Sequence, residues 1–484
     1  MNTTKRLSKY YHSEKIYLWE WILVAAVGLL VFSSAAYVDL KSLTVWSTNV
    51  WDVICDSNIF HLYEYSAENI YGLNHEYMGS ELMSVLPWSV WNLPIWIAQR
   101  FFGVTIVESS LSLAWSKLFL VALSVLMLYY TYKICMIIIN DKVRSLWCVF
   151  FTASSFFLYV GVFYTGQNDI IMITASVFAV YCLLRNKNIS FLVWSAVAIS
   201  IKPFFLIAFV AIILLKQKNF IKIFIELLVS VSGLAIQKLI FMKAPMYAES
   251  MTNGPSENML AEMFPANIKT SFGSVSFFAI ALVLICFYAY TRNFDNEKSM
   301  EDGRILYCKY VIYIITMVYL SYLMFSPFSY YRVTLLVPFL YIMICCNKQN
   351  LGYSIIFDTA MIIGLIMRII IRRSQFCRVT DTNYSLFQSL MGHRIDPSTA
   401  SYPTLYEFFD NRFGLIVDLQ ALFSSIALAS GIILLVLNHP QRSVNIPKQL
   451  DECPRILIWA RTVLIVPFIL ALLYLFTTAT GKLY

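Results

Sequence analysis

The sequence predicts an all-α polytopic membrane protein that forms a single transmembrane domain over residues 1–484. Hydrophobic residues make up 59% of the chain and charged residues 13%, whereas a soluble domain carries about 25% charged residues. Many apolar runs approach the length of about 20 residues that a helix needs to cross a bilayer. No polar stretch is long enough for a separate soluble domain of about 100 residues, so the loops are expected to be insertions into one helical body.

The apolar runs give the expected spans in order along the chain. They lie at approximately 17–38, 112–134, 145–164, 167–184, 219–241, 273–291, 305–325, 352–371, 416–437 and 455–477. Residues 189–216 form a further apolar tract, and Lys202-Pro203 interrupts it, which predicts two short helices that meet there. Residues 82–104 contain Pro87 and Pro94 and suit a bent or re-entrant segment. We expect a bundle of roughly 11 to 13 transmembrane helices.

The positions of Lys and Arg orient the chain, because cytoplasmic loops carry an excess of these residues. With the N-terminus inside, a first outer loop covers about 39–81, while Lys133, Lys142 and Arg144 fall inside. The net charge of +8 is therefore attributed to orientation, and no nucleic-acid partner is expected.

One segment breaks this rule. The count of spans places a late outer loop at about 372–414 on the outer side of the membrane, although this loop carries several arginines: Arg372, Arg373, Arg378, Arg394 and Arg412. Either the count of spans is wrong or these cations bind an anionic group. The ten cysteines form no CxxC pair and no Cys/His cluster, so neither a metal nor another cofactor is expected.

Asp39 is the first candidate for a catalytic base. It stands where the first apolar run ends and opens a loop rich in carboxylates and aromatic residues. A carboxylate at the boundary between hydrocarbon and water is partly desolvated, which favours a general base; an ordinary helix-end carboxylate is the equal alternative. Asp52 is the reserve candidate, on an amphipathic stretch at 40–54 that is expected along the membrane surface. His61 and Glu64 lie in the same loop and are candidate substrate-binding residues.

The same topology places further polar groups on the outer side. Gln167, Asn168 and Asp169 stand at the start of one expected span and are candidate substrate-binding residues, although a capping or dipole role is at least as good an explanation for Asp169. Lys202 is a candidate ligand for a phosphate, because an ammonium inside an apolar tract is usually functional or paired. Snorkelling of Lys202 to the interface is the alternative.

Tyr331 and Arg332 complete the candidate phosphate-binding set. They follow the span at 305–325, and a guanidinium suits bidentate contact with phosphate. The alternative for Arg332 is a simple anchor at a helix end. Carboxylates and cations on one side of the membrane suit a reaction in which a base deprotonates a hydroxyl while cations stabilise a phosphate leaving group.

Taken together, these motifs resemble those of membrane glycosyltransferases of the GT-C fold. The likeness lies in Asp39, in Glu68–Tyr77 with Leu86-Pro87-Trp88, in Gly166-Gln167-Asn168-Asp169 and in Ile201-Lys202-Pro203. The resemblance covers about the first half of the chain, and Ser326–Arg332 is a further segment that resembles the family. The chain is similar to polyprenyl-phosphate-sugar-dependent enzymes, such as the mannosyltransferases of GPI-anchor and inositol-mannoside synthesis or the phage-type O-antigen glucosyltransferases.

The resemblance implies a GT-C-like bundle with extracytoplasmic loops and juxtamembrane helices. It implies inverting, metal-independent transfer of a sugar from a polyprenyl-phosphate donor to a glycan or glycolipid hydroxyl. In that family a first-loop carboxylate, matched here to Asp39, deprotonates the acceptor, and Lys202 and Arg332 match the basic positions that hold the lipid phosphate. The expected setting is a bacterial plasma membrane, with membrane lipids around the chain and the site facing the periplasm or exterior. Asp39 is followed by Leu40-Lys41 where many relatives have a second acid or an aromatic residue, which leaves the base open between Asp39 and Asp52.

Two other classes of protein remain as alternatives to a glycosyltransferase of this family. A transporter or flippase for a lipid-linked or anionic solute would also need cations in the membrane, and it predicts inverted repeats and broken midplane helices; the sequence shows no internal repeat. An O-antigen polymerase or ligase would use a diphosphate-linked donor, and its large arginine-rich outer loop would resemble residues 372–414.

Overall fold

The structure is a computed structural model that describes residues 15–34, 38–56, 58–68, 78–103, 109–253, 263–265, 267–271, 273–294, 300–326, 330–347, 350–371, 418–441 and 459. The late arginine-rich loop, the expected span at 455–477 and most of the Glu68–Tyr77 motif lie outside these residues.

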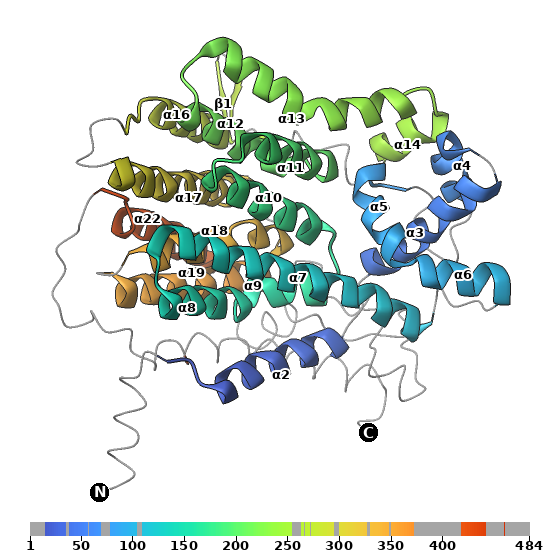
Figure 1. Cartoon of the computed structure of the whole chain (residues 1–484), viewed down its shortest axis with the longest axis horizontal. Helices are drawn as coiled ribbons and strands as arrows, with labels where there is room; N and C mark the ends of the chain where they lie inside the picture. The colour runs from blue at the N-terminus through green and yellow to red at the C-terminus, as the bar shows by residue number, and fades with distance from the viewer. Residues whose placement is uncertain are drawn as a thin grey trace, which may run out of the picture.

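Helices make up almost all of the regular structure in the described residues, which confirms the expected all-α class (Figure 1). The first half contains α2 (Leu18–Ser34), α3 (Val38–Asp56), η1 (Ile59–His61), α4 (Leu62–Glu68), α5 (Leu82–Trp91), α6 (Leu93–Phe102), α7 (Ser110–Ile139), α8 (Lys142–Ala153), α9 (Phe156–Leu158), η2 (Tyr159–Tyr164), α10 (Asp169–Leu184), α11 (Asn188–Ile201), α12 (Phe204–Lys216) and α13 (Phe220–Phe241). The second half contains α14 (Pro245–Asn253), α16 (Phe277–Tyr290), α17 (Met300–Phe325), η3 (Tyr330–Leu335), α18 (Val337–Cys346), α19 (Leu351–Ile371) and α22 (Asp418–Leu437). Strands β1 (Ile268–Thr270) and β2 (Gly273–Val275) form a short antiparallel pair.

The length and the apolar composition of these helices identify the chain as an integral membrane protein. Within the described residues, five helices are long and apolar enough to cross a bilayer: α7, α13, α17, α19 and α22. Residues 142–153 with 156–164 add a sixth span if this pair, bent by 48°, crosses as one. Seven shorter apolar helices have 10–17 residues: α2, α5, α10, α11, α12, α16 and α18. In the described part of the chain, the expected total of roughly 11 to 13 spans is reached only when these shorter helices are included.

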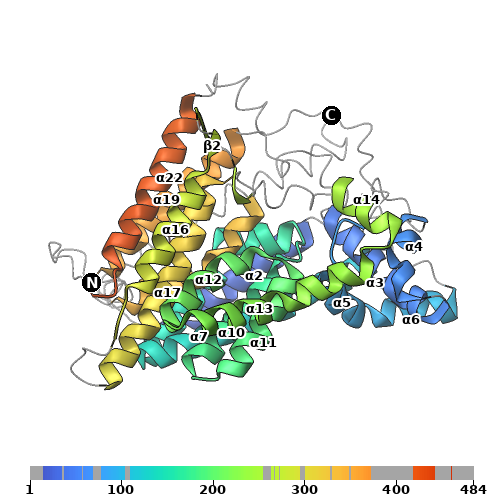
Figure 2. The ribbon, with the colours of Figure 1, turned by 90° about the horizontal axis from the view of Figure 1, so that it is seen from above.

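Helix α7 connects the two ends of the molecule. It packs against α8, α10, α17 and α18 along the main bundle and against α3 and α5 at its N-terminal end. Helices α3, α4, α5, α6 and α14 gather at one end of the molecule, and α16, α17, α19 and α22 lie together at the other (Figures 1 and 2). The contacts between α7 and α3 hold the start of α3 against the bundle.

The amphipathic stretch at 40–54 forms a helix, α3, that is buried within the protein for most of its length, and its expected position along the membrane surface stays a prediction. Residues 42–50 of α3 are all buried within the protein. Their hydroxyl groups find protein partners, since Thr44 donates to Ser116 Oγ at 2.9 Å and Ser47 Oγ accepts from Asn92 at 2.9 Å. Polar groups satisfied in this way no longer need contact with water or headgroups.

The break that was predicted at Lys202-Pro203 is confirmed. Helix α11 ends at Ile201, and α12 begins at Phe204. A proline disfavours the helical conformation of the residue before it, and Lys202 accordingly has extended backbone angles of φ −150° and ψ 133°. From this break the lysine side chain reaches Asp169 at the start of α10.

Candidate functional site

Asp39 and Gln167 lie side by side although 128 positions separate them in the sequence. Asp39 is in the first turn of α3, partly buried, and its Oδ2 accepts a hydrogen bond from Gln167 Nε2. Gly166 explains how the two segments approach so closely. Its φ of +65° lies in the left-handed region, and a Cβ at this position would stand 2.9 Å from Leu40 Cβ. Glycine is therefore the residue that fits this turn.

Asp169 and Lys202 form an ion pair next to this contact. Lys202 Nζ lies 2.9 Å from Asp169 Oδ2, and the aspartate side chain is only 2% exposed. Asp169 lies in the first turn of α10, where the helix dipole favours a negative charge. Its second oxygen, Oδ1, is buried and has no hydrogen-bond partner among the residues that the structure describes. The lysine side chain keeps 17% exposure, and an ammonium has three donors, so a ligand can still reach it.

Arg332 lies close to the chain segment that carries Lys202. Its Nη1 donates a hydrogen bond to the Tyr322 hydroxyl at 3.0 Å, and its guanidinium carbon lies 5.0 Å from the centre of the Phe204 ring. Phe204 is two residues beyond Lys202, and two residues of chain span at most about 7 Å. The ring of Tyr331 lies 5.8 Å from the same guanidinium. The turn between α11 and α12 thus carries Lys202 and leads directly into Phe204, whose ring packs against Arg332.

Three contacts, together with the short stretches of chain from Gln167 to Asp169 and from Lys202 to Phe204, link residues of α3, α10, α12 and η3 into one group. We call it the Asp39–Arg332 cluster: Asp39, Gln167, Asp169, Lys202, Phe204 and Arg332. It contains a carboxylate held by an amide, an ion pair and a guanidinium held against aromatic rings. Such a group can accept a proton at one point and stabilise a phosphate at another. In the described part of the chain, no group of three or more His, Cys, Asp or Glu side chains is placed to hold a metal ion.

The other candidate residues of the first loop lie outside this cluster. Asp52 is on the same helix as Asp39, but about 20 Å further along it at about 1.5 Å per residue. Its carboxylate accepts a hydrogen bond from Trp96 Nε1 at 2.8 Å. His61 is exposed in η1, and Glu64 is partly buried in α4. One site of ordinary size cannot use both Asp39 and Asp52.

Asn168 lies between the two pairs but makes no capping bond. It precedes α10 and is 4% exposed, and its side chain forms no hydrogen bond to the first turn of that helix. Tyr322 and Phe204, which hold Arg332, were missed by the sequence analysis. Both lie within apolar runs, so their aromatic character looked like ordinary membrane packing, and only the position of Arg332 gives them a role.

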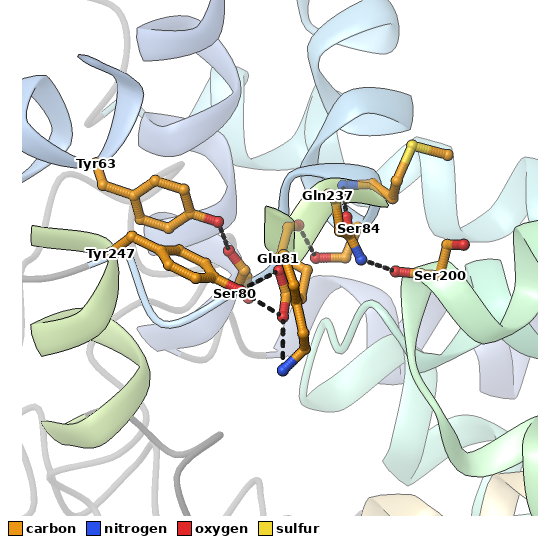
Figure 3. A network of polar contacts seen from close by, with 9 residues as sticks. Tyr63, Ser80, Glu81, Ser84, Ser200, Gln237 and Tyr247 are labelled. Carbon is orange, nitrogen blue, oxygen red and sulfur yellow. Dashed lines mark hydrogen bonds and ion pairs between the residues drawn. The ribbon is translucent and has the colours of Figure 1, made fainter. Parts of the chain in front are cut away.

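A second polar network surrounds Glu81, which stands at the predicted end of the first outer loop (Figure 3). Glu81 precedes α5, and both of its carboxylate oxygens accept from the Tyr247 hydroxyl at 3.2 Å. Lys238 Nζ lies 3.7 Å from Oε1. Tyr63 lies beside Tyr247, with ring centres 4.8 Å apart, and donates to the Ser80 carbonyl at 3.2 Å.

This network continues toward the end of α11. Gln237 on α13 accepts from the Met83 backbone N–H at 3.2 Å and donates to the Ser200 carbonyl at 2.8 Å (Figure 3). Ser200 is two residues before Lys202, so the start of α5 is tied to the segment that presents the lysine. Gly233 permits this contact, because a Cβ there would stand 2.3 Å from Ser200 Oγ. The Glu81 network therefore supports the chain segment just before Lys202.

The pH dependence of stability should report on Glu81. Burial raises the pKa of its carboxyl above the usual value of 4.5, and Lys238 and Tyr247 only partly oppose this rise. The folded protein thus holds this proton more tightly than the unfolded chain, so the stabilisation is complete below pH 4.5 and is lost as the pH rises through the raised value. In thermal unfolding, Glu81→Gln, which cannot ionise, should lose less stability than the wild type as the pH rises from 4.5 through the raised pKa of Glu81. Glu249→Gln, an exposed change on the helix that carries Tyr247, is the control, and equal pH slopes for Glu81→Gln and wild type would refute the assignment.

Comparisons of the chain with family models, curated proteins and solved structures find no match. The likeness to GT-C glycosyltransferases therefore stays a prediction from the motifs. The structure pairs Asp39 with Gln167 and Asp169 with Lys202, and it packs Arg332 against Phe204, two residues beyond Lys202. The Glu68–Tyr77 part of the likeness lies almost entirely outside the described residues.

Proposed function

We propose that the chain is an inverting glycosyltransferase that moves a sugar from a polyprenyl-phosphate carrier to a hydroxyl group of a glycan or glycolipid. The observation that supports this most is the Asp39–Arg332 cluster, in which two carboxylates and two cations from distant parts of an integral membrane protein are linked by contacts and short stretches of chain. A transfer from a lipid phosphate needs these two kinds of group and no metal.

Lys202 and Arg332 would hold the donor phosphate. A lipid-linked phosphate must be bound where its polyprenyl chain stays in the bilayer, and apolar helices on both sides of Lys202 suit that need. Arg332 adds a fork of donors that matches phosphate oxygens. Its stacking on Phe204 and Tyr331 fixes the fork before a ligand arrives, which lowers the entropy cost of binding.

Asp39 would act as the general base. Its carboxylate would accept the proton of the acceptor hydroxyl as the oxygen attacks the anomeric carbon. The bond from that carbon to the phosphate oxygen would break at the same time, and the phosphate would leave with the electron pair toward Lys202 and Arg332. One displacement inverts the anomeric configuration. Gln167 would orient the base through its hydrogen bond to Oδ2.

The site would face the periplasm or exterior of a bacterial plasma membrane. This side follows from the positive-inside reading of the loops, which puts the start of α3 and the start of α10 outside. Nucleotide sugars are made in the cytoplasm, so a lipid-linked sugar is the donor that this orientation favours.

A transfer assay with purified protein tests the proposal. The protein in detergent or nanodiscs is given radiolabelled polyprenyl-phosphate hexoses, and label in the acceptor fraction is measured, with polyprenyl-diphosphate sugars and nucleotide sugars as parallel donors. We expect transfer from a monophosphate donor with an inverted linkage. Transfer from the diphosphate donor alone would indicate an O-antigen polymerase or ligase, and donor movement across vesicles without any transfer would indicate a flippase; either result refutes the proposal.

A further inference from the structure

A cavity of about 390 Å³ lies at the C-terminal end of α7, away from the Asp39–Arg332 cluster. Its walls come from α7, the start of α8, α17 and the end of α18. The lining residues are Ile138, Ile139, Asp141, Arg144, Lys309, Cys346 and Asn347. The volume falls within the range of small-molecule sites, about 300–1,000 Å³, and two cations from different helices face the same space.

Arg144 has donor capacity that the fold does not use. Its Nη2 atom is buried and has no hydrogen-bond partner among the described residues. One oxygen of the nearby Asp141 carboxylate, Oδ1, is engaged in the cap of α8, where it accepts the backbone N–H groups of Val143 and Arg144 at 2.9 and 3.3 Å. A buried guanidinium N–H without a partner is costly, so an anionic ligand at this point would stabilise the protein.

The position of the cavity favours a lipid as the source of the anion. Thr44, near the start of α3, bonds to Ser116 in the first part of α7, while Ile138 lines the cavity. The stretch of α7 from Ser116 to Ile138 is about 33 Å long, close to the thickness of about 30 Å of the hydrocarbon core. If the start of α7 lies at one membrane boundary, this length would place the cavity at the opposite one, where the sequence predicts the cytoplasmic side. Basic pockets between helices at that boundary bind anionic headgroups.

The apolar residues around the cavity also favour a lipid as the ligand. Ile138 and Ile139 form one wall, and Leu146, two residues beyond Arg144 on α8, is 45% exposed on the outside of the bundle. We propose that this cavity binds the phosphate group of an anionic lipid, with Arg144 and Lys309 as the two cationic ligands. This site is separate from the proposed catalytic site and does not depend on the proposed function.

Binding of dioctanoyl phosphatidic acid to the full chain in detergent, followed by native mass spectrometry and by thermal unfolding, tests the proposal. Phosphatidylcholine of the same chain length and inorganic phosphate are the parallel ligands. We expect one molecule of phosphatidic acid per chain, and at least about tenfold weaker binding in Arg144→Gln and in Lys309→Gln, since a charge-assisted hydrogen bond contributes on this scale. Lys309→Arg should retain binding.

Lys142→Gln is the matched control, because Lys142 is an exposed lysine on the same helix and does not line the cavity. It should bind like the wild type. Inorganic phosphate that competes at equal affinity would keep the phosphate site but overturn the lipid as its source. Equal losses in Lys142→Gln and Arg144→Gln, or equal binding of phosphatidylcholine, would overturn the site itself.

Discussion

Replacing Asp39 by asparagine is expected to lower the turnover number for sugar transfer by at least about 100-fold, the lower end of what a general base contributes. The substitution removes the ability to accept a proton but keeps the shape of the side chain. The amide oxygen of the new residue can still accept the hydrogen bond from Gln167 that Asp39 Oδ2 now accepts. The start of α3 should therefore keep its place, and the loss should appear in kcat. The readout is initial rates with saturating polyprenyl-phosphate sugar.

Asp52→Asn gives the matched control for this prediction. It makes the same chemical change on the same helix, about 20 Å away, where the carboxylate contacts Trp96. This variant should transfer sugar at close to the wild-type rate. Normal turnover in Asp39→Asn, or loss only in Asp52→Asn, would remove Asp39 from the role of base.

Replacing Lys202 by methionine is expected to lower the free energy of unfolding by about 3 kcal/mol, because it leaves Asp169 charged, buried and without its cation. Asp169 is 2% exposed, so water cannot replace the lost ammonium. The same variant should also lose transfer, since the phosphate loses one of its two cations. Chemical denaturation in a mild detergent, followed by tryptophan fluorescence, measures the first effect.

Two comparisons separate the buried pair from a general effect of charge removal. The double variant Asp169→Leu with Lys202→Met should recover much of the stability, because an apolar pair of similar size can replace a buried ion pair. Arg100→Met removes the cation of an exposed pair with Asp56 and should change stability very little. If Lys202→Met were as mild as Arg100→Met, or if the double variant were no more stable than the single one, the pair would have no structural role.

The sequence predicts much of the helical frame because length and apolar composition depend on local residues. The two helices that meet at Lys202-Pro203 could be predicted from the proline alone. Helix α18 was missed because the apolar run that contains it, 333–346, begins directly after Arg332 and is shorter than the length of about 20 residues expected of a span. The burial of α3 was missed as well, since its polar side chains suggested contact with a surface and their real partners are Asn92 and Ser116.

The candidate site, too, could be predicted from the sequence only in part. Asp39, Lys202 and Arg332 could be chosen from the sequence because each is a charge at the end or in the middle of an apolar run. The link between Gln167 and Asp39 could not be foreseen, because it depends on how Gly166 lets one loop approach α3. Glu81 was missed for a related reason, since its partner Tyr247 is 166 positions away. Contacts at such separations follow from the packing of helices and leave no local pattern.

The most direct measurement is a structure of the protein with a polyprenyl-phosphate sugar bound. The account predicts that the phosphate lies within hydrogen-bonding distance of Lys202 Nζ and of the Arg332 guanidinium, with the anomeric carbon turned toward the side where Asp39 meets Gln167. A phosphate bound away from both cations, or a sugar whose anomeric carbon faces away from Asp39, would contradict it.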